Sequence, residues 1–119
     1  MGEQFARALA YKDPACLKAL MKPDGDFRAL TPSKAWEAND ADEMVDEIIL
    51  GTWFDPERQI TELLAADNDR VGSIERVGYR FMVHRPDGEF IIKQQAYYST
   101  EDDKISWLRI MWTGFLPLG

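Results

Sequence analysis

The chain is 119 residues long, which leaves room for one domain, expected over residues 1–119. Its apolar content of 45%, with four Trp, four Tyr and six Phe, is enough for a core and for the lining of a cavity. The net charge of −7 argues against binding to nucleic acid or to an anionic membrane surface, since both need clustered Lys and Arg.

The single cysteine, Cys16, excludes an internal disulfide and fits a reducing compartment. It lies among small and apolar residues with no base nearby, so we expect a buried thiol rather than a nucleophile. No stretch approaches the roughly eighteen apolar residues of a membrane span. The first residues lack the basic segment and apolar run of a secretory signal. We therefore expect a cytoplasmic protein.

Apolar residues at helical spacing predict three helices in the first half of the chain. The expected ranges are 3–12, 14–21 and about 40–51. Asp13 is a cap and Pro14 a first-turn residue for the second helix. Either Asn39 or Asp40 caps the third helix, and Gly51 closes it.

The segments around the third helix carry tryptophans. After the second helix we expect a strand over residues 26–31, followed by a helical turn that presents Trp36. Beyond the third helix, Trp53 and Phe54 are left exposed unless another element covers them.

From Gln59 onward the hydrophobic period changes to two, which predicts strands. The expected strands are 59–66, 70–84, 89–99 and 104–113, and the expected turns are 67–69, 85–88 and 101–103. The turn segments are rich in Asp, Asn, Pro and Gly, which suit tight turns. Consecutive strands with short connections predict an antiparallel meander.

One register places the apolar sides of the last three strands on a common face. The expected neighbours are Val83 with Phe90, Phe81 with Ile92, Tyr79 with Gln94, Ala96 with Leu108, Gln94 with Ile110 and Ile92 with Trp112.

The opposite face of these strands is too apolar for a fully wetted sheet. Its apolar members are Met82, Ile91, Tyr97, Trp107 and Met111, interspersed with Arg, Lys and Gln. An amphipathic, aromatic-rich surface is typical of a subunit interface. We therefore expect a homodimer through the outer face of the sheet.

The order of the elements resembles the nuclear transport factor 2-like superfamily, whose members include ketosteroid isomerase, limonene epoxide hydrolase, scytalone dehydratase and the SnoaL-like polyketide cyclases. The resemblance rests on residues 5–9 and 13–20, similar to the opening helices, and on 103–112, similar to the last turn and strand. It implies an α+β fold in which N-terminal helices pack on a strongly curved antiparallel sheet. Such a cone-shaped, cystatin-like roll encloses a pocket.

The catalytic patterns of these enzymes do not carry over. The carboxylate of ketosteroid isomerases at the end of the first strand falls near Leu30, and their oxyanion-hole carboxylate falls near Gln94 or Gln95. The Arg-x-Asp of the epoxide hydrolases has Gly78 in place of its Asp, and their second Asp corresponds to Ile110. The histidine of scytalone dehydratase has no match. The fold alone implies no reaction.

Tyr79 and Gln94 are the candidate catalytic residues. A phenol and an amide in an apolar pocket could orient a carbonyl or stabilise a developing enolate; alternatively, they only satisfy each other. Phe54 is a further candidate for the pocket wall. The expected ligand-binding residues are Trp36, Trp53, Tyr79, Phe81, Gln94, Tyr98, Ile110 and Trp112.

Other polar residues are weaker candidates. Glu62 and Glu75 could lie on one face of adjacent strands and raise the pKa of one carboxyl, although a bulge would turn Glu75 outward and Arg76 inward. His84 flanks a turn and is expected to be exposed. Asp26 and Arg28 could form an ion pair at the pocket mouth. The sequence shows no metal-ligand spacing and no cofactor fingerprint, so we expect neither a metal nor a cofactor.

Three functions remain open. The chain could hold a small, largely apolar ligand without turnover. It could be a cofactor-independent isomerase, cyclase or dehydratase, which would need a titratable group with a shifted pKa inside the pocket. It could also be a dimerisation domain with a filled core and no ligand.

Overall fold

A computed structural model describes residues 1–32 and 34–117. The helices are α1 (Gly2–Ala10), α2 (Pro14–Leu20) and the π-helix η1 (Glu43–Trp53). The strands are β1 (Met21–Thr31), β2 (Lys34–Ala38), β3 (Gln59–Val71), β4 (Ile74–Arg85), β5 (Gly88–Glu101) and β6 (Lys104–Pro117).

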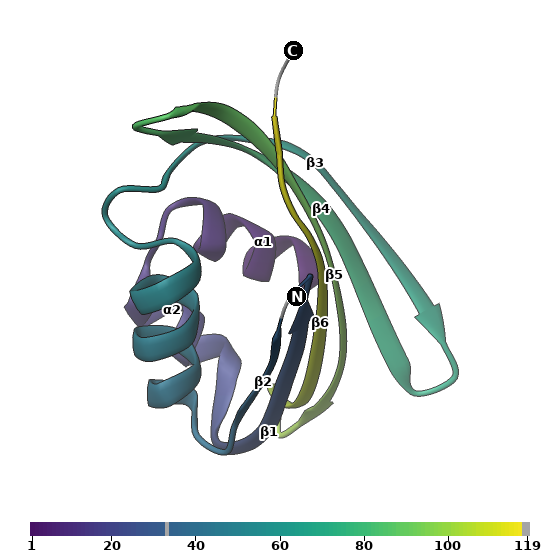
Figure 1. Cartoon of the computed structure of the whole chain (residues 1–119). Helices are drawn as coiled ribbons and strands as arrows, with labels where there is room; N and C mark the ends of the chain where they lie inside the picture. The colour runs from purple at the N-terminus through teal and green to yellow at the C-terminus, as the bar shows by residue number, and fades with distance from the viewer. Residues whose placement is uncertain (33, 118–119) are drawn as a thin grey trace.

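The strands of the described residues form one curved, open sheet in the order β2-β1-β6-β5-β4-β3. The sheet bends around α1, and the teal helix η1, which packs on α2, lies on the same concave side (Figure 1). The prediction of an α+β fold with helices on a curved sheet is confirmed. The sheet is not wholly antiparallel, because β1 and β6 pair in parallel. No described helix is long and apolar enough to cross a membrane.

The start of α2 follows the predicted capping chemistry. The Asp13 carboxylate accepts a hydrogen bond from the Cys16 backbone N–H at 3.1 Å, and Pro14 occupies the first helical position. The prediction that Cys16 is buried is wrong, because its side chain is exposed. A hydrogen bond to the nearby Asp13 carboxylate raises the pKa of the Cys16 thiol, which keeps it protonated.

The third helix is π-helical and runs past Gly51 to Trp53. Its closing bond joins the Phe54 N–H to the Ile49 carbonyl, five residues back, at 2.8 Å. A Cβ on Gly51 would lie 2.5 Å from the backbone oxygen of Asp46, so this turn of the helix needs glycine. Because the helix continues beyond Gly51, Trp53 and Phe54 are directed into the core, where both are buried.

The helical turn expected around Trp36 is a strand instead. Residues Lys34–Ala38 form β2, which pairs antiparallel with β1 and sets Trp36 opposite Ala29. The first strand is also longer than expected and begins at Met21. Backbone hydrogen bonds to β1 therefore decide the conformation of this short segment.

The turn expected at 67–69 is also wrong. β3 continues through residues 67–69 to Val71, and the chain reverses at Gly72, whose φ is +62°. Arg76 on β4 lies within 2.9 Å of Asp67 and 3.9 Å of Asp69, so one guanidinium holds both acids in the strand. Gly72 is suited to the turn because a positive φ favours glycine.

The predicted register of β4 and β5 is confirmed, including Tyr79 opposite Gln94. The predicted register of β5 and β6 is wrong by two residues, since Ala96 pairs with Ile110 rather than Leu108. Two features cause the shift. The turn has two residues, Asp102 and Asp103, and the pairing of the strands is irregular between Ser99 and Thr100. A shift of two keeps every side chain on its expected face.

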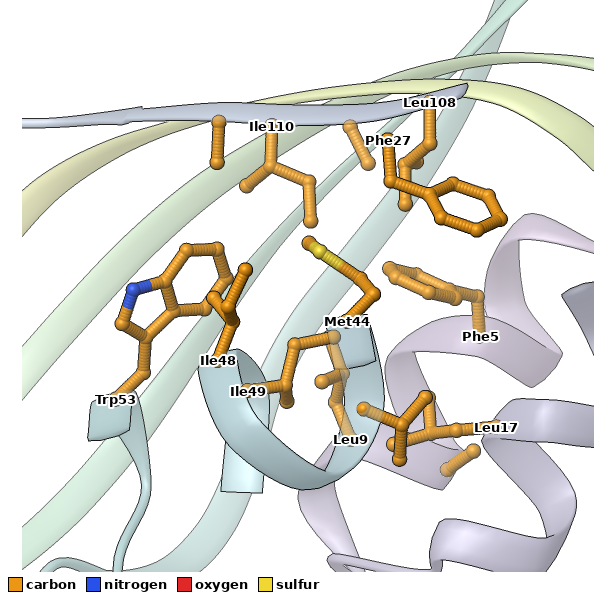
Figure 2. Close-up of a cluster of buried hydrophobic side chains, with 14 of the residues drawn as sticks. Phe5, Leu9, Leu17, Phe27, Met44, Ile48, Ile49, Trp53, Leu108 and Ile110 are labelled. Carbon is orange, nitrogen blue, oxygen red and sulfur yellow. The ribbon is translucent and has the colours of Figure 1, made fainter. Parts of the chain in front are cut away.

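The core lies between the concave face and the helices (Figure 2). Side chains from α1, α2, η1, β1 and β6 meet there: Phe5, Leu9, Leu17, Phe27, Met44, Ile48, Ile49, Trp53, Leu108 and Ile110.

Candidate functional site

Tyr79 and Gln94 lie side by side on the concave face of β4 and β5. The Tyr79 hydroxyl donates a hydrogen bond of 2.6 Å to Oε1 of Gln94. Their exposed fractions are 3% and 2%, so the pair is enclosed by the core. Burial raises the pKa of the Tyr79 phenol far above its ordinary value, which keeps it neutral.

The other half of the Gln94 amide has no partner. Its Nε2 is buried and has no hydrogen-bond acceptor in the described residues, and the same holds for the indole Nε1 of Trp53. Gln94 lies opposite Trp112, whose ring is 5.3 Å from that of Trp53. Figure 2 shows the Trp53 nitrogen turned away from the other labelled side chains. Two buried N–H donors therefore lie in the same aromatic part of the core.

Aromatic rings connect these donors to the rest of the concave face. Centroid distances link Trp36 to Trp53 (6.0 Å), Trp53 to Trp112 (5.3 Å), Trp112 to Phe54 (5.6 Å), Phe54 to Phe81 (6.1 Å) and Phe81 to Tyr79 (5.1 Å). The structure thus brings together most of the side chains expected to line a pocket.

Tyr98 and Ile110 are placed differently. Ile110 lies on the concave face beside Ala96. Tyr98 lies opposite Glu75 near the start of α1. Burial and, less strongly, the Glu75 carboxylate raise the pKa of the Tyr98 phenol. By strand alternation Glu75 faces the concave side and Arg76 the outer side.

The weaker candidates do not form a catalytic group. Glu62 pairs with Met82 and Glu75 with Arg70, so the two glutamates are not neighbours. His84 is exposed as expected, and its Nδ1 is 3.3 Å from the Glu89 carboxylate.

The ion pair of Asp26 and Arg28 is present, with Nε and Oδ1 3.5 Å apart. Arg109 also binds Asp26, through Nη2 at 3.1 Å from Oδ2. The three residues lie in adjacent strands on the outer face of the sheet, not on the concave face.

The interior is closely packed in this conformation. Tyr79, Phe81, Gln94 and Ile110 have exposed fractions of 0–3%, so other side chains cover them. Two clefts of about 460 Å³ each lie on the outer face, and Trp36, Ile110 and Trp112 reach their borders. In the described chain no three His, Cys, Asp or Glu side chains are grouped to hold a metal ion.

No protein-family model and no curated protein matches this sequence. Solved structures do match. One is a candidate isomerase from Bacillus subtilis, with a TM-score of 0.73 and 15% identity over 93% of this chain and 82% of that one. Another, from Burkholderia thailandensis, has a TM-score of 0.69 and 16% identity over 92% of this chain and 85% of that one. The latter is an NTF2-like protein, and the two folds agree along nearly the whole chain. The fold is nuclear transport factor 2-like.

A third structure with the nuclear transport factor 2-like fold has ketosteroid isomerase-like architecture and comes from Catenulispora acidiphila. Its TM-score is 0.67 at 13% identity, over 94% of this chain and 84% of that one. Other structures that match include epoxide hydrolase-like and candidate polyketide cyclase proteins. At these identities the likeness shows the fold and no subfamily, which confirms the expected resemblance at the level of fold.

The sequence missed the indole N–H of Trp53 as a polar group of the interior. Trp53 was expected in the pocket wall, but the helix end expected at Gly51 left its burial open, and the spacing of apolar residues carries no signal for a π-helix. Two adjacent aromatics, Trp53 and Phe54, two residues after Gly51 and before the strands begin, are the one feature that could have drawn attention to this segment.

Proposed function

We propose that this chain is a small-molecule-binding protein that holds a small, largely apolar ligand against the concave face of its sheet. The observation that carries the proposal is the Gln94 amide, whose Oε1 is fixed by Tyr79 while its buried Nε2 has no acceptor in the described residues. A buried donor without an acceptor costs about 1–3 kcal/mol. A ligand oxygen at Nε2 would remove that cost.

The chemistry of the interior favours an uncharged ligand with a hydrogen-bond acceptor. The available groups, Gln94 Nε2 and Trp53 Nε1, are donors, and donors repel a cation. An anion would need a cationic partner once it leaves water. Gln94 is the buried polar residue of the described core, which holds no buried Lys or Arg. A ketone, aldehyde, ether or epoxide oxygen meets these conditions.

Binding requires the aromatic wall to open, because the interior is filled. The wall most suited to movement is formed by Trp53, the last residue of the π-helix, and Phe54, which follows it. A ligand that binds the open form more tightly than the closed form shifts the population toward the open form. The size of the shift is set by the ratio of the two affinities.

The interior favours binding over turnover. An isomerase, cyclase or dehydratase would need an ionisable group beside the ligand. Tyr79 is held neutral and hydrogen-bonded to Gln94, and Glu75 lies at the other end of the face, beside Tyr98. The structure from Catenulispora acidiphila, which shares this fold, is a complex with the small molecule trimethylamine.

Three compounds with one bicyclic skeleton test the proposal: camphor, bornane and bornylamine, which carry a ketone, no heteroatom and an ammonium group. Camphor is expected to bind, with shifts in the indole N–H resonances of the NMR spectrum. Gln94→Leu is expected to weaken camphor binding about fivefold to tenfold, the equivalent of one hydrogen bond.

Gln95→Leu is the matched control, since Gln95 is the next residue and faces the outer side. It should leave camphor binding unchanged. Absence of binding by all three compounds, or equal affinity of the wild type and Gln94→Leu for camphor, would contradict the proposal.

A further inference from the structure

One of the two clefts on the outer face combines a cation with an apolar surface. This cleft, which we call the Lys93 cleft, lies over β1, β5 and β6 and has a volume of about 460 Å³, within the range of clefts that hold small molecules. Lys93, Gln95 and Tyr97 line it from β5. They alternate along the strand with buried residues of the concave side. The sheet therefore separates the Lys93 cleft from the interior.

Part of the lining is apolar. Leu30 and Met111 are register neighbours in β1 and β6, with exposed fractions of 54% and 53%. Large apolar side chains that lie next to each other and are half exposed offer contact area to an apolar group. The second outer cleft contains the same two residues and reaches β2. The apolar surface therefore continues beyond the Lys93 cleft, across β1.

The charge of the cleft is positive and has no counterpart. Among the described residues that line it, Lys93 is the one charged side chain. Arg80 on β4 lies directly opposite Lys93, although like charges in such positions destabilise a sheet. Neither cation forms an ion pair within residues 1–32 and 34–117, even though the sequence has seven more acids than bases. An anion from outside the chain would offset their repulsion.

A hydrogen-bond donor lies on the same side of β5. The Tyr97 hydroxyl donates to Oε1 of Gln95 at 3.2 Å, so the Gln95 amide keeps its Nε2 for another partner. Carboxylate oxygens accept hydrogen bonds from amide and ammonium groups alike, and such charge-assisted bonds are the stronger ones. Lys93 and Gln95 together suit a carboxylate.

We propose that the Lys93 cleft binds an organic anion, whose carboxylate lies at Lys93 and Gln95 and whose hydrocarbon chain lies over Leu30 and Met111. A medium-chain fatty acid has this chemistry. The cation and the amide fix the head group, and the two half-exposed side chains lose contact with water when the hydrocarbon covers them.

The far end of the apolar surface favours one carboxylate over two. Arg28 and Arg109 both bind the Asp26 carboxylate there, at 3.5 Å and 3.1 Å. Glu37 lines the second cleft and would repel a second carboxylate. The uncharged end of the ligand therefore belongs at this end of the surface.

The proposal is independent of the interior ligand, because the two sites lie on opposite sides of the sheet. It competes with the homodimer expected from the sequence, since a second copy on the outer face would cover the Lys93 cleft. The experiments below separate these occupants.

Octanoate, octanol and octylamine test the charge of the site, because they share one hydrocarbon chain and differ in the head group. Octanoate is expected to shift the methyl resonance of Met111 in the NMR spectrum of the full chain until the site is saturated. Octanol should bind more weakly, and octylamine should not bind. Lys93→Gln should weaken octanoate binding about fivefold. Lys104→Gln, an exposed lysine at the opposite end of β6, is the matched control and should leave it unchanged.

Chain length tests the apolar part of the site. From butanoate to octanoate the affinity should rise about twofold for each added CH₂, less than the roughly fourfold that full burial would give. Met111→Gln should reduce this rise. Val71→Gln should not, because Val71 is more exposed than Met111 but lies at the far end of the β3–β4 hairpin.

Gln94→Leu should leave octanoate binding unchanged, so a failure of this proposal is distinguishable from a failure of the interior site. An equal response of the Met111 methyl group to octanoate and octylamine would overturn the proposal. So would the absence of any response, and a wild-type dimer in sedimentation equilibrium would then identify a second copy as the occupant of the outer face.

Discussion

Gln94 and Gln95 are chemically identical neighbours that face opposite sides of one strand. Gln95 is exposed, and its Oε1 accepts a hydrogen bond of 3.2 Å from the Tyr97 hydroxyl. Gln94 is buried, with its oxygen bonded to Tyr79 and its nitrogen without an acceptor in the described chain. The Tyr79 hydroxyl thereby fixes which end of the Gln94 amide points toward the aromatic core. A polar residue held in this orientation can donate a hydrogen bond to an acceptor placed at its Nε2.

The hydrogen bond between Tyr79 and Gln94 can be measured by a double-mutant cycle. Tyr79→Phe leaves the buried Oε1 of Gln94 without a donor and should lower the free energy of unfolding by about 1–3 kcal/mol. The Tyr79→Phe/Gln94→Leu double variant removes both partners and should be less destabilised than the sum of the two single variants. Urea unfolding followed by circular dichroism gives all four values. Additive effects would mean that the hydrogen bond contributes nothing to stability.

Strand alternation was sufficient to predict this pair from the sequence. Tyr79 and Gln94 are found opposite each other because a short hairpin fixes the register and the apolar residues fix the face. The same method could not predict that Nε2 of Gln94 lacks an acceptor, since that depends on every side chain packed around it. It named Trp53 as a pocket residue but left its burial open, because that burial depends on how the preceding helix ends.

At the scale of elements, η1 determines how the concave face is closed. Its π-helical turns add residues beyond Gly51, and Thr52 Oγ1 donates to the Glu47 carbonyl at 2.8 Å, again five residues back. The helix therefore ends with Trp53 and Phe54 directed into the core. Because π-helical turns are rare and occur often at functional sites, η1 is the element most directly connected with the proposed ligand.

Gly51→Ala tests the geometry of η1. The added Cβ would lie 2.5 Å from the Asp46 carbonyl oxygen, so the helix must rewind or shift. We expect a loss of stability of about 1–3 kcal/mol and a change in near-ultraviolet circular dichroism as Trp53 moves. Glu47→Ala, an exposed position in the same helix, should change neither. Equal stability of Gly51→Ala and the wild type would show that the close approach does not exist in solution.

Elements with local signals were predicted well, and elements that depend on distant partners were not. The two later hairpins follow from alternation and turn residues, whereas β2 became a strand because β1 was available as a partner. Residues 67–69 have the composition of a turn, but they lie in a strand in which Arg76 pairs with both Asp67 and Asp69. The parallel pairing of β1 and β6 joins segments about 80 residues apart and has no local signature.

For the molecule as a whole, the two sides of the sheet have different roles. The concave side is filled by helices and aromatic rings, and its unpaired groups are neutral donors. The outer side is half exposed and carries charged side chains. The ligand that we propose for the interior would therefore contact the concave side and leave the outer side exposed.

The capacity of the concave side to hold a ligand can be tested by removing one wall. Trp53→Ala should destabilise the protein by about 3–5 kcal/mol, the usual result of a large cavity in a core. Indole should bind in the space left by the side chain and raise the melting temperature of the variant, as mass action requires. Trp107→Ala is the control, because Trp107 lies on the outer face under Arg109 and its removal leaves no enclosed space. Differential scanning calorimetry at increasing indole concentration measures both variants. If indole stabilises Trp53→Ala no more than Trp107→Ala, the interior collapses when it is opened, and it cannot serve as the ligand site that we propose.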